Sequence, residues 1–287
     1  MGKHPPGSHS SIKVPVKRAD TSRHADDSDW LVIEEPLEIR INDGEQSHSV
    51  SVTMRTPGAD FDLTAGFLLT EGIIRNAADI HSMGYTTDQN TEKPSQNIVV
   101  VNLAPGVDID IGKLQRNFYA TSSCGVCGKA SLEALAFESS YEVNGDRLVI
   151  DPAALNALPD RLASEQATFA RTGGLHAAAV FDAEGRILEV REDIGRHNAV
   201  DKLIGAMFRS NRLPLWNLGI LTSGRTSFEI LQKARMAGCP MVAAVGAPSS
   251  LAAELAWEVD MTLIGFLRDQ RFNIYTGPAR IGPAPDH

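Results

Sequence analysis

The feature that most constrains the fold is a strand–helix rhythm in the last third of the chain. Short apolar runs alternate with segments of helical spacing, in the order Leu218–Thr222, Ser227–Ala237, Met241–Gly246, Ser249–Glu258 and Met261–Phe266. The apolar runs are continuous rather than alternating, which is typical of strands that are buried on both faces of a sheet. The second half of the chain is therefore predicted to form a layered α/β domain.

The residues just before this rhythm extend the same domain. Asn198–Arg209 has apolar side chains at helical spacing and is predicted to be an amphipathic helix. A hairpin is expected over Leu175–Val190, and a weakly helical, exposed segment over Pro152–Phe169. We assign residues 121–287 to this α/β domain.

The chain before residue 121 has a different pattern. Apolar and polar residues alternate over residues 50–54, as in a strand with one buried face, after a turn at residues 42–44. Two further strands and a helix are expected at Leu31–Ile41 (interrupted at Pro36), Ile98–Leu103 and Asp60–Gly72. Residues 30–120 are therefore predicted to form a β-rich N-terminal subdomain.

The first 29 residues are rich in His, Ser, Pro, Lys and Asp and contain few apolar side chains. Such a segment buries too little surface to offset the entropy that is lost on ordering. We therefore predict a disordered polar tail at residues 1–29. The tail has no apolar central block and is not a secretory signal.

Charge and composition exclude several classes of protein. The 287 residues contain 27 Lys and Arg against 36 Asp and Glu, a net charge of −9. Binding of a nucleic-acid duplex depends mainly on basic side chains that neutralise its phosphates. A broad nucleic-acid interface is therefore not expected on a chain this acidic. No apolar run approaches the ~18 residues of a membrane span, so we expect a cytoplasmic protein without a membrane partner. Three cysteines, two of them close together, fit a reducing cytosol.

The segment that carries the most chemistry is Thr121–Lys129, with the sequence TSSCGVCGK. Cys124 and Cys127 are three positions apart at the predicted start of a helix, so both thiols can face one point. Free N–H groups and the helix dipole at such a start stabilise a thiolate. Gly125 and Gly128 leave room beside the sulfurs for a bulky ligand.

Three chemical interpretations of this thiol pair stay open on spacing alone. A zinc site would need two further ligands, for which His176 and His197 are candidates. A redox pair is a second interpretation, although the chain lacks the thioredoxin-like pattern of a small βαβ domain. A persulfide carrier would use one thiolate as the nucleophile that accepts a sulfane sulfur. Simple packing of the two cysteines is the least favoured interpretation.

Two turns that follow strands have side chains suited to phosphate. The segment Ser223–Ser227 leaves an apolar strand and opens a helix, so its N–H groups, hydroxyls and guanidinium could cradle a phosphate. An ordinary capped turn explains the same residues equally well. His197 lies in a second such turn beside Asp193 and Arg196, where structural and catalytic roles are about equally favoured.

Four polar residues, Arg268, Asp269, Gln270 and Arg271, lie between two predicted strands. This position is typical of the turn of a β-hairpin that has no other role. The two planar guanidinium groups also suit a phosphate or a guanine. Both interpretations stay open on the residues alone.

Six separated motifs give the chain a resemblance to a known family. They occur in order from Gly66 to Gly277 and are GFLLTEGII, TSSCGVCGKASLEAL, GGLHAAAVF, EDIGRHNAVDKLIG, TSGRTSFEILQKA and GFLRDQRFNIYTG. These motifs resemble those of the FdhD family of formate dehydrogenase accessory proteins. The resemblance runs from about Trp30 to the end of the chain.

The resemblance implies a sulfurtransferase that serves molybdenum or tungsten enzymes. Such a protein accepts sulfur from a cysteine desulfurase and passes it to the bis-molybdopterin guanine dinucleotide cofactor. The cofactor then enters the catalytic subunit of formate dehydrogenase. The implied fold is a cytidine-deaminase-like three-layer α/β/α core with an added N-terminal part, in a homodimer. The molybdenum cofactor is cargo in this interpretation, and no permanently bound metal is expected.

The resemblance also implies roles for individual residues. Cys124 and Cys127 match the family's paired cysteines, and Cys124 is expected to carry the persulfide. The family binds the cofactor in its last segment, so contacts are expected at Phe266, Leu267, Arg268, Asp269, Gln270 and Arg271. We expect the rest of the cofactor site at His197 and at the loop residues Ser223, Gly224, Arg225, Thr226 and Ser227.

Two other functions stay open. A cofactor-binding chaperone would hold and deliver the finished cofactor without sulfur chemistry. A zinc deaminase also places paired cysteines at a helix start, but it needs a His-x-Glu motif. His176 and His197 are each followed by alanine at the second position, so the deaminase motif is missing. The zinc interpretation therefore becomes a minor one.

Overall fold

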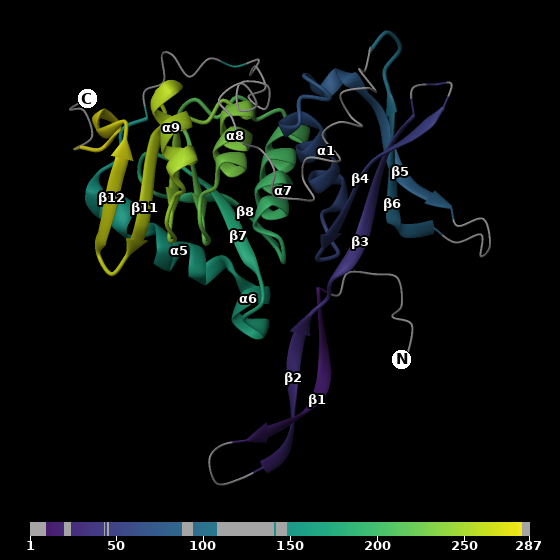
Figure 1. Cartoon of the computed structure of the whole chain (residues 1–287), viewed down its shortest axis with the longest axis horizontal. Coiled ribbons are helices and arrows are strands. Elements are labelled where there is room, and N and C mark those ends of the chain that lie inside the picture. The colour runs from purple at the N-terminus through teal and green to yellow at the C-terminus, as the bar shows by residue number, and fades with distance from the viewer. Residues whose placement is uncertain are drawn as a thin grey trace.

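The computed structural model is a mixed α/β molecule (Figure 1). It describes residues 10–19, 24–42, 44, 46–87, 94–107, 141 and 148–282. Within these residues the strands form sheets of two, four and six strands. No helix in the described ranges has both the length and the apolar character that crossing a membrane requires.

The first two strands form an arm that projects from the body of the molecule (Figure 1). β1 (Ser11–Ala19) pairs antiparallel with β2 (His24–Val32) over its whole length. The prediction of a disordered tail before Trp30 is therefore wrong for these residues. β1 alternates apolar side chains with others over Ile12–Lys17, and this period of two favours a strand even in a polar segment.

A four-stranded sheet with the order β4-β3-β6-β5 follows the arm. Its strands are β3 (Glu35–Asn42), β4 (Ser47–Arg55), β5 (Ile80–Thr87) and β6 (Pro94–Leu103). Alternate side chains of β3 are buried, at Leu37, Ile39 and Ile41. The expected interruption at Pro36 is wrong, because this proline lies within β3 and the chain leaves strand geometry at residues 33–34.

The buried face of this sheet packs in one core with α1 (Asp60–Thr70), which is followed by the short 3-10 helix η1 (Ala77–Asp79). Helix α1 confirms the predicted helix and ends slightly before the predicted end at Gly72. The predicted boundary between residues 120 and 121 lies outside the described residues.

The six-stranded sheet has the order β12-β11-β10-β9-β7-β8. Its strands are β7 (His176–Phe181), β8 (Ile187–Asp193), β9 (Gly219–Thr222), β10 (Met241–Ala244), β11 (Thr262–Arg268) and β12 (Arg271–Thr276). β9, β10 and β11 run parallel, whereas β7 and β12 run antiparallel to their neighbours. The predicted hairpin and the predicted strand–helix rhythm are both confirmed.

Helices accompany both faces of this sheet (Figure 1). On one side are α7 (Arg196–Arg209), α8 (Phe228–Met236) and α9 (Ser250–Glu258). On the other are α4 (Pro152–Asn156) and α5 (Leu158–Glu165). The remaining helices are short, namely α6 (Ala167–Thr172) and the 3-10 helix η2 (Pro278–Arg280).

Alternate residues of the strands enter two separate hydrophobic cores. Ala178 and Val180 pack in the core that contains the side chains of α7 and α8. Ala177, Ala179 and Phe181 pack in the core that contains those of α4 and α5. The sheet is therefore the middle of three layers, with helices on each side.

Helices α1 and α7 cross at two glycines. A methyl group built on Gly66 would lie 1.9 Å from the carbonyl oxygen of Asp201, and one on Gly205 would lie 1.8 Å from that of Asp62. The two backbones therefore meet without a side chain between them. One hydrophobic core accordingly contains side chains of both larger sheets.

Candidate functional site

The candidate site is the edge of the six-stranded sheet at which β9, β10 and β11 end. Because these strands are parallel, the loops that follow them meet at one edge. Gly246 N donates to Gly224 O at 3.1 Å, and Phe266 N donates to Gly246 O at 3.0 Å. The structure thus brings the predicted segment Ser223–Ser227 and the predicted residue Phe266 to one place.

Two helices begin at this edge without a side-chain cap. The N-cap residues are Gly195 for α7 and Ser227 for α8, and neither makes a side-chain capping hydrogen bond. His197 Nε2 and Ser227 Oγ are 3.1 Å apart, so a hydrogen bond links the two helix starts. Free N–H groups and the helix dipole favour anions at such starts. The edge is therefore suited to a phosphate.

His197 is held neutral at this edge. Burial, followed by the positive charges of Arg196 and Lys233, lowers the pKa of His197 to about 4. Its Nε2 also lies 3.9 Å from Glu229 Oε2, a carboxylate whose charge opposes the shift. A neutral imidazole has one donor and one acceptor nitrogen, which suits His197 to orient Ser227 or a polar ligand.

A second histidine, His176, lies beside the loop that follows β9, although it was not predicted to contact the cofactor. A methyl group built on Gly224 would lie 3.2 Å from His176 Nδ1 and 3.9 Å from Arg196 Cδ. Burial and the charge of Arg196 lower the pKa of His176. Arg196 is therefore a cation placed near both histidines. Sequence spacing does not indicate this, because His176 begins β7 whereas Arg196 begins α7.

The residues of the loop after β9 (Ser223–Ser227) differ in the contacts of their side chains. Ser223 Oγ accepts a hydrogen bond from Ala177 N at 2.9 Å and so holds β7, whereas Arg225 is exposed. Thr222 and Thr226 are buried, and their hydroxyl oxygens have no hydrogen-bond partner among the described residues. Buried polar atoms are almost always paired, so these two hydroxyls suit a ligand or a bound water.

A cluster of buried charges couples to this edge and was not predicted from the sequence. Lys233 Nζ donates to Glu71 Oε1 and to Thr70 Oγ1, each at 3.0 Å, and lies 3.0 Å from Asp201 Oδ2. Burial raises the pKa of Asp201 to about 6, although Lys233 opposes the shift. These residues come from the end of α1, from α7 and from α8. No local spacing reveals such a cluster, and the one signal was the presence of Glu71 in the first family motif.

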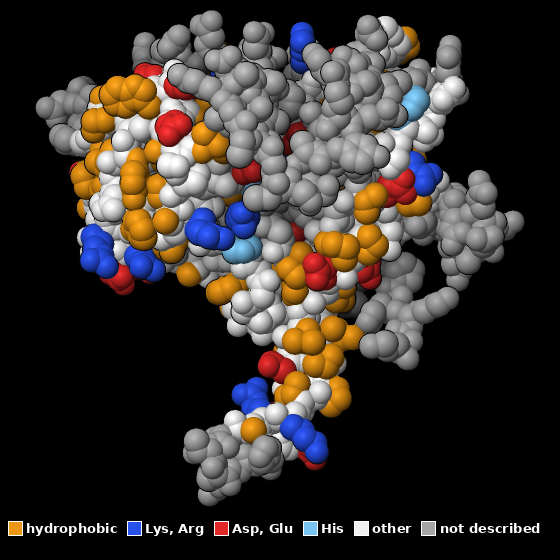
Figure 2. Space-filling model, viewed as in Figure 1, with side chains coloured by type: hydrophobic (Ala, Val, Ile, Leu, Met, Phe, Trp, Pro, Cys, Tyr) orange, Lys and Arg blue, Asp and Glu red, His pale blue; other side chains and the backbone are white. Residues whose placement is uncertain are grey.

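The predicted cofactor segment Phe266–Arg271 includes the turn between β11 and β12. Its backbone has positive φ angles at Phe266, Asp269 and Gln270. Arg268 pairs with Arg271 across the turn, and both are exposed. Leu267 is fully buried in the core, so only its backbone could reach a ligand. In Figure 2, basic side chains gather along the lower edge of the body, where Figure 1 shows this turn.

Cys124 and Cys127 lie outside the described residues, and their distance from this edge stays a prediction. The third cysteine, Cys239, is buried in the core. No group of three or more His, Cys, Asp or Glu side chains that could hold a metal ion occurs within the described ranges. A zinc site would draw on the two cysteines at 124 and 127, so this finding does not decide the zinc interpretation.

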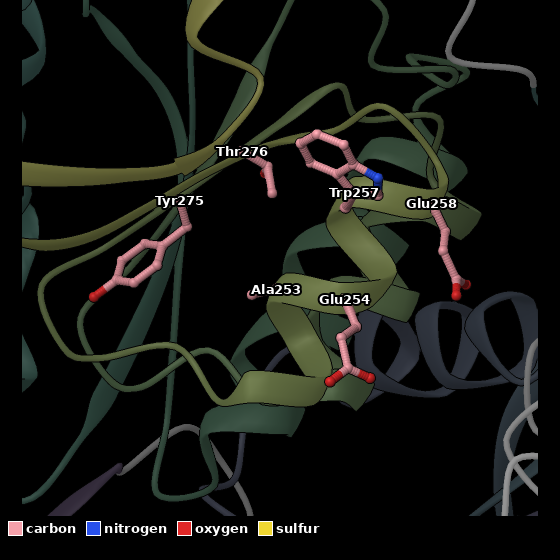
Figure 3. A pocket seen from close by; sticks show the side chains of 6 residues that line it. All are labelled: Ala253, Glu254, Trp257, Glu258, Tyr275 and Thr276. Atoms are coloured by element: carbon pink, nitrogen blue, oxygen red, sulfur yellow. The ribbon is translucent and has the colours of Figure 1, made fainter.

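A separate open pocket lies between α9 and β12 (Figure 3). Its volume is about 360 Å³, and it is lined by Ala253, Glu254, Trp257, Glu258, Tyr275 and Thr276. Thr276 pairs with Leu263 near the start of β11, so this end of β12 points away from the loop edge. None of the lining residues was predicted to bind the cofactor.

Comparison with known proteins adds independent information. The model of the FdhD/NarQ family matches residues 32–282. The sulfur carrier protein FdhD of Mycolicibacterium paratuberculosis is 53% identical over 253 residues, which cover 88% of this chain and 92% of that protein. The sulfur carrier protein FdhD of Sulfolobus acidocaldarius is 38% identical over 269 residues, which cover 94% and 98%.

A solved structure shows the same fold. The crystal structure of a formate dehydrogenase accessory protein from Desulfotalea psychrophila superposes with a TM-score of 0.74 at 23% identity. The match covers 96% of this chain and all of the other. The resemblance inferred from six motifs is confirmed by the family match over residues 32–282 and by the identity to curated relatives. The chain belongs to the FdhD/NarQ family.

Proposed function

We propose that the protein carries sulfur as a persulfide and transfers it to the bis-molybdopterin guanine dinucleotide cofactor of formate dehydrogenase. The sulfur comes from a cysteine desulfurase, whose persulfide is attacked at its outer sulfur by the thiolate of Cys124. The donor's S–S bond breaks as the new one forms, and the donor leaves as a thiolate. Cys127 assists this exchange or resolves the persulfide.

The observation that carries the proposal is the edge of the six-stranded sheet, where two uncapped helix starts and a guanidinium suit an anion. The two uncapped helix starts and the guanidinium of Arg196 are groups that bind a pyrophosphate. The buried hydroxyls of Thr222 and Thr226, at the end of β9 and on the loop after it, have no partner among the described residues. The exposed arginines at 268 and 271 add planar donors for a guanine or a further phosphate. The relatives named sulfur carrier proteins support the sulfur chemistry.

Mass spectrometry after incubation with a cysteine desulfurase and cysteine tests the sulfur step. We expect the wild-type protein to gain about 32 Da, the mass of one sulfur atom, on the peptide that contains Cys124. The variant Cys124→Ser should not gain it. Cys239→Ala is the matched control and should keep the adduct, because Cys239 is buried in the core. An undiminished adduct in Cys124→Ser would move the carrier role to another residue.

Calorimetric titration with GDP tests the nucleotide site. Removing one charge-assisted contact, as in Arg268→Gln or Arg271→Gln, should weaken binding by about 10-fold or more. Arg186→Gln is the control, because Arg186 is an exposed arginine whose ion pairs are with Asp182 and Glu184 at the turn between β7 and β8. Equal affinity for GDP in all three variants would show that the turn at residues 266–271 is not part of the nucleotide site.

The chaperone function makes the opposite prediction for the cysteines. Formate dehydrogenase activity in cells that carry the Cys124→Ala/Cys127→Ala variant separates the two functions. We expect this activity to be lost. Full activity would favour a protein that only holds and delivers the cofactor.

We further propose a cytoplasmic homodimer whose core belongs to the cytidine-deaminase-like class. The three layers of helix, sheet and helix support that class. Three cysteines, two of them close together, support a reducing compartment. The expected protein partners are the cysteine desulfurase and the catalytic subunit of formate dehydrogenase.

A further inference from the structure

The pocket between α9 and β12 has two aromatic walls (Figure 3). One wall is the indole of Trp257, which is 78% exposed, the largest exposed fraction among the large apolar side chains of the described ranges. The other is the ring of Tyr275, which is 40% exposed and comes from the edge strand β12. Single exposed apolar side chains are common on monomers, but aromatic rings that line a hollow are typical of a binding site.

The wall formed by Tyr275 is backed by β11. A methyl group built on Gly265 would lie 3.0 Å from Tyr275 Cε2, so the ring lies against the backbone of that strand. The next residue, Thr276, also lines the pocket. Its hydroxyl accepts a hydrogen bond from Leu263 N at 3.1 Å and donates one to Met261 O at 2.7 Å. This hydroxyl therefore holds β12 to β11, and the charged groups that a ligand meets come from α9.

Helix α9 contributes two carboxylates to the lining, Glu254 and Glu258. Both side chains are exposed, and neither has an ion pair or a side-chain hydrogen bond with another residue that the structure describes. They are four positions apart and therefore lie on the same side of the helix, where like charges repel each other. A positive charge placed beside both of them would offset this repulsion.

The end of α9 also lacks the cation that the neighbouring helices have. Arg209 lies in the last turn of α7, and Lys233 and Arg235 lie in the last turn of α8, whereas the last turn of α9 has no basic residue. Glu258 is instead the last residue of α9. Because the C-terminal end of a helix carries a partial negative charge, a cation stabilises it and a carboxylate does not. This end of α9 is therefore suited to a cation that the helix itself does not supply.

The surroundings of the pocket have the same character. In Figure 2, hydrophobic and acidic side chains gather at the upper left of the body, where Figure 1 shows α9, whereas basic side chains lie along the lower edge. The whole chain has a net charge of −9. An acidic surface of this kind attracts a partner whose own surface is basic.

The lining selects among the classes of ligand. The two carboxylates repel a phosphate. An apolar surface laid on Trp257 would strip water from the same carboxylates, which costs free energy unless a cation pairs with them. A guanidinium meets both demands, because it stacks on aromatic faces and its planar fork binds carboxylates. The methylene groups of an arginine side chain also pack on apolar surface.

The pocket lies away from the loop edge of the six-stranded sheet. Helix α9 begins at that edge, where Ser249 N donates to Thr226 O at 2.9 Å. At 1.5 Å per residue, Trp257 lies about 12 Å further along the helix axis than Ser249. An arginine in the pocket therefore leaves the loops of that edge free.

We infer that this pocket binds the arginine side chain of a basic protein partner. The guanidinium lies on the indole of Trp257 and pairs with Glu254 and Glu258. The chain thereby gains an attachment point at which a partner stays bound while the loop edge is open to the cofactor. The inference goes beyond the proposed function and depends neither on sulfur transfer nor on nucleotide binding.

A titration of the full chain with acetyl-Gly-Arg-Gly-amide, followed by NMR of the tryptophan indole N–H groups, tests the inference. The chain has three tryptophans, Trp30, Trp216 and Trp257, and the variant Trp257→Phe identifies the signal of the third. We expect this signal alone to shift saturably at low ionic strength, where exposed ion pairs are least screened. The same peptide with citrulline, which keeps the shape of arginine without its charge, should bind about 10-fold more weakly.

The variant Glu254→Gln/Glu258→Gln removes both carboxylates and keeps the indole as the reporter. It should weaken binding of the arginine peptide by about 5-fold or more. Both side chains are exposed, so the fold should survive. Asp160→Asn/Glu165→Gln is the matched control, because it removes two exposed carboxylates from helix α5. This control should bind the peptide like the wild type.

The inference is overturned if the arginine peptide leaves the Trp257 signal unmoved, or if the citrulline peptide binds equally well. Wild-type affinity in Glu254→Gln/Glu258→Gln, or equal weakening in Asp160→Asn/Glu165→Gln, would also overturn it. A Trp257 signal that moves with protein concentration in the absence of peptide would assign the pocket to a second copy of this chain instead of a basic partner.

Discussion

Replacing Gly205 by alanine tests the close crossing of α1 and α7. The added methyl group would lie 1.8 Å from the carbonyl oxygen of Asp62. An ordinary contact between these atoms needs about 3.4 Å, so the helices must separate by roughly 1.6 Å. The opposing atom belongs to the backbone, and no side-chain rotation can relieve the clash. The substitution must therefore disturb the core that both helices share.

The expected loss of stability combines two opposing effects. Overpacking of a tight core costs up to about 3 kcal/mol, and alanine in place of glycine in a helix returns about 0.5–1 kcal/mol. The net loss is then up to about 2–2.5 kcal/mol, which corresponds to a fall in Tm of roughly 4–10 °C for a chain of this size. Gly66→Ala should behave alike, because its methyl group would lie 1.9 Å from Asp201 O.

Thermal unfolding followed by intrinsic fluorescence measures this loss. Gly84→Ala is the control, because Gly84 lies in β5 with no atom within 4 Å of an added methyl group. It should change Tm by no more than about 2 °C. In the double variant Gly66→Ala/Gly205→Ala the losses should be less than additive, since helices that are already apart accept the second methyl group. A Tm for Gly205→Ala equal to or above that of the wild type would refute the close crossing.

Three further predictions concern titratable side chains that are wholly or partly buried. His197 should stay neutral down to about pH 5 in an NMR titration, because its pKa is lowered to about 4. The unfolded chain then binds more protons than the folded one between about pH 6.5 and 4, so this histidine should make stability fall as the pH falls through that window. A normal titration near pH 6.5 would contradict this. Lys233→Met should lower stability by about 3 kcal/mol, because it leaves the buried carboxylate of Asp201 and the partly buried one of Glu71 without their cation. It should also raise the pKa of His197, whereas Lys233→Arg should restore part of the lost stability and keep part of the pKa shift. Lys202→Met should cost a similar amount in chemical denaturation, because Asp193, 2.7 Å from Lys202 Nζ, is buried; an unchanged midpoint would show that the buried pair contributes nothing.

The elements predicted best from the sequence are the strands that are buried on both faces of the sheet. The strands β9, β10 and β11 are covered by helices or neighbouring chain on each face, so their apolar runs are continuous and easy to locate. Strand β5 was missed, because Ile80–Thr87 has few apolar residues and none of its described side chains is buried. The arm was missed for a related reason, since composition alone does not show which strand a polar segment will pair with.

The residues of the candidate site likewise fall into those that could be predicted from the sequence and those that could not. Ser223–Ser227 was predictable because a turn between a buried strand and a helix places its residues at the sheet edge. His176 and the Lys233 cluster were not, because their partners come from elements distant in the chain. Leu267 was assigned to the site with its neighbours, although the alternation of β11 sends its side chain into the core.

The shared core of the two larger sheets limits how this protein can be divided. Side chains from β3 and β6 mix with those from β9 and β10 in a single cluster. A fragment that ended before β7 would expose to water the side of α1 that meets α7, and a fragment that began at β7 would lack α1. Neither piece is an autonomous building block. Limited proteolysis or gene truncation should consequently yield either the intact fold or aggregated material.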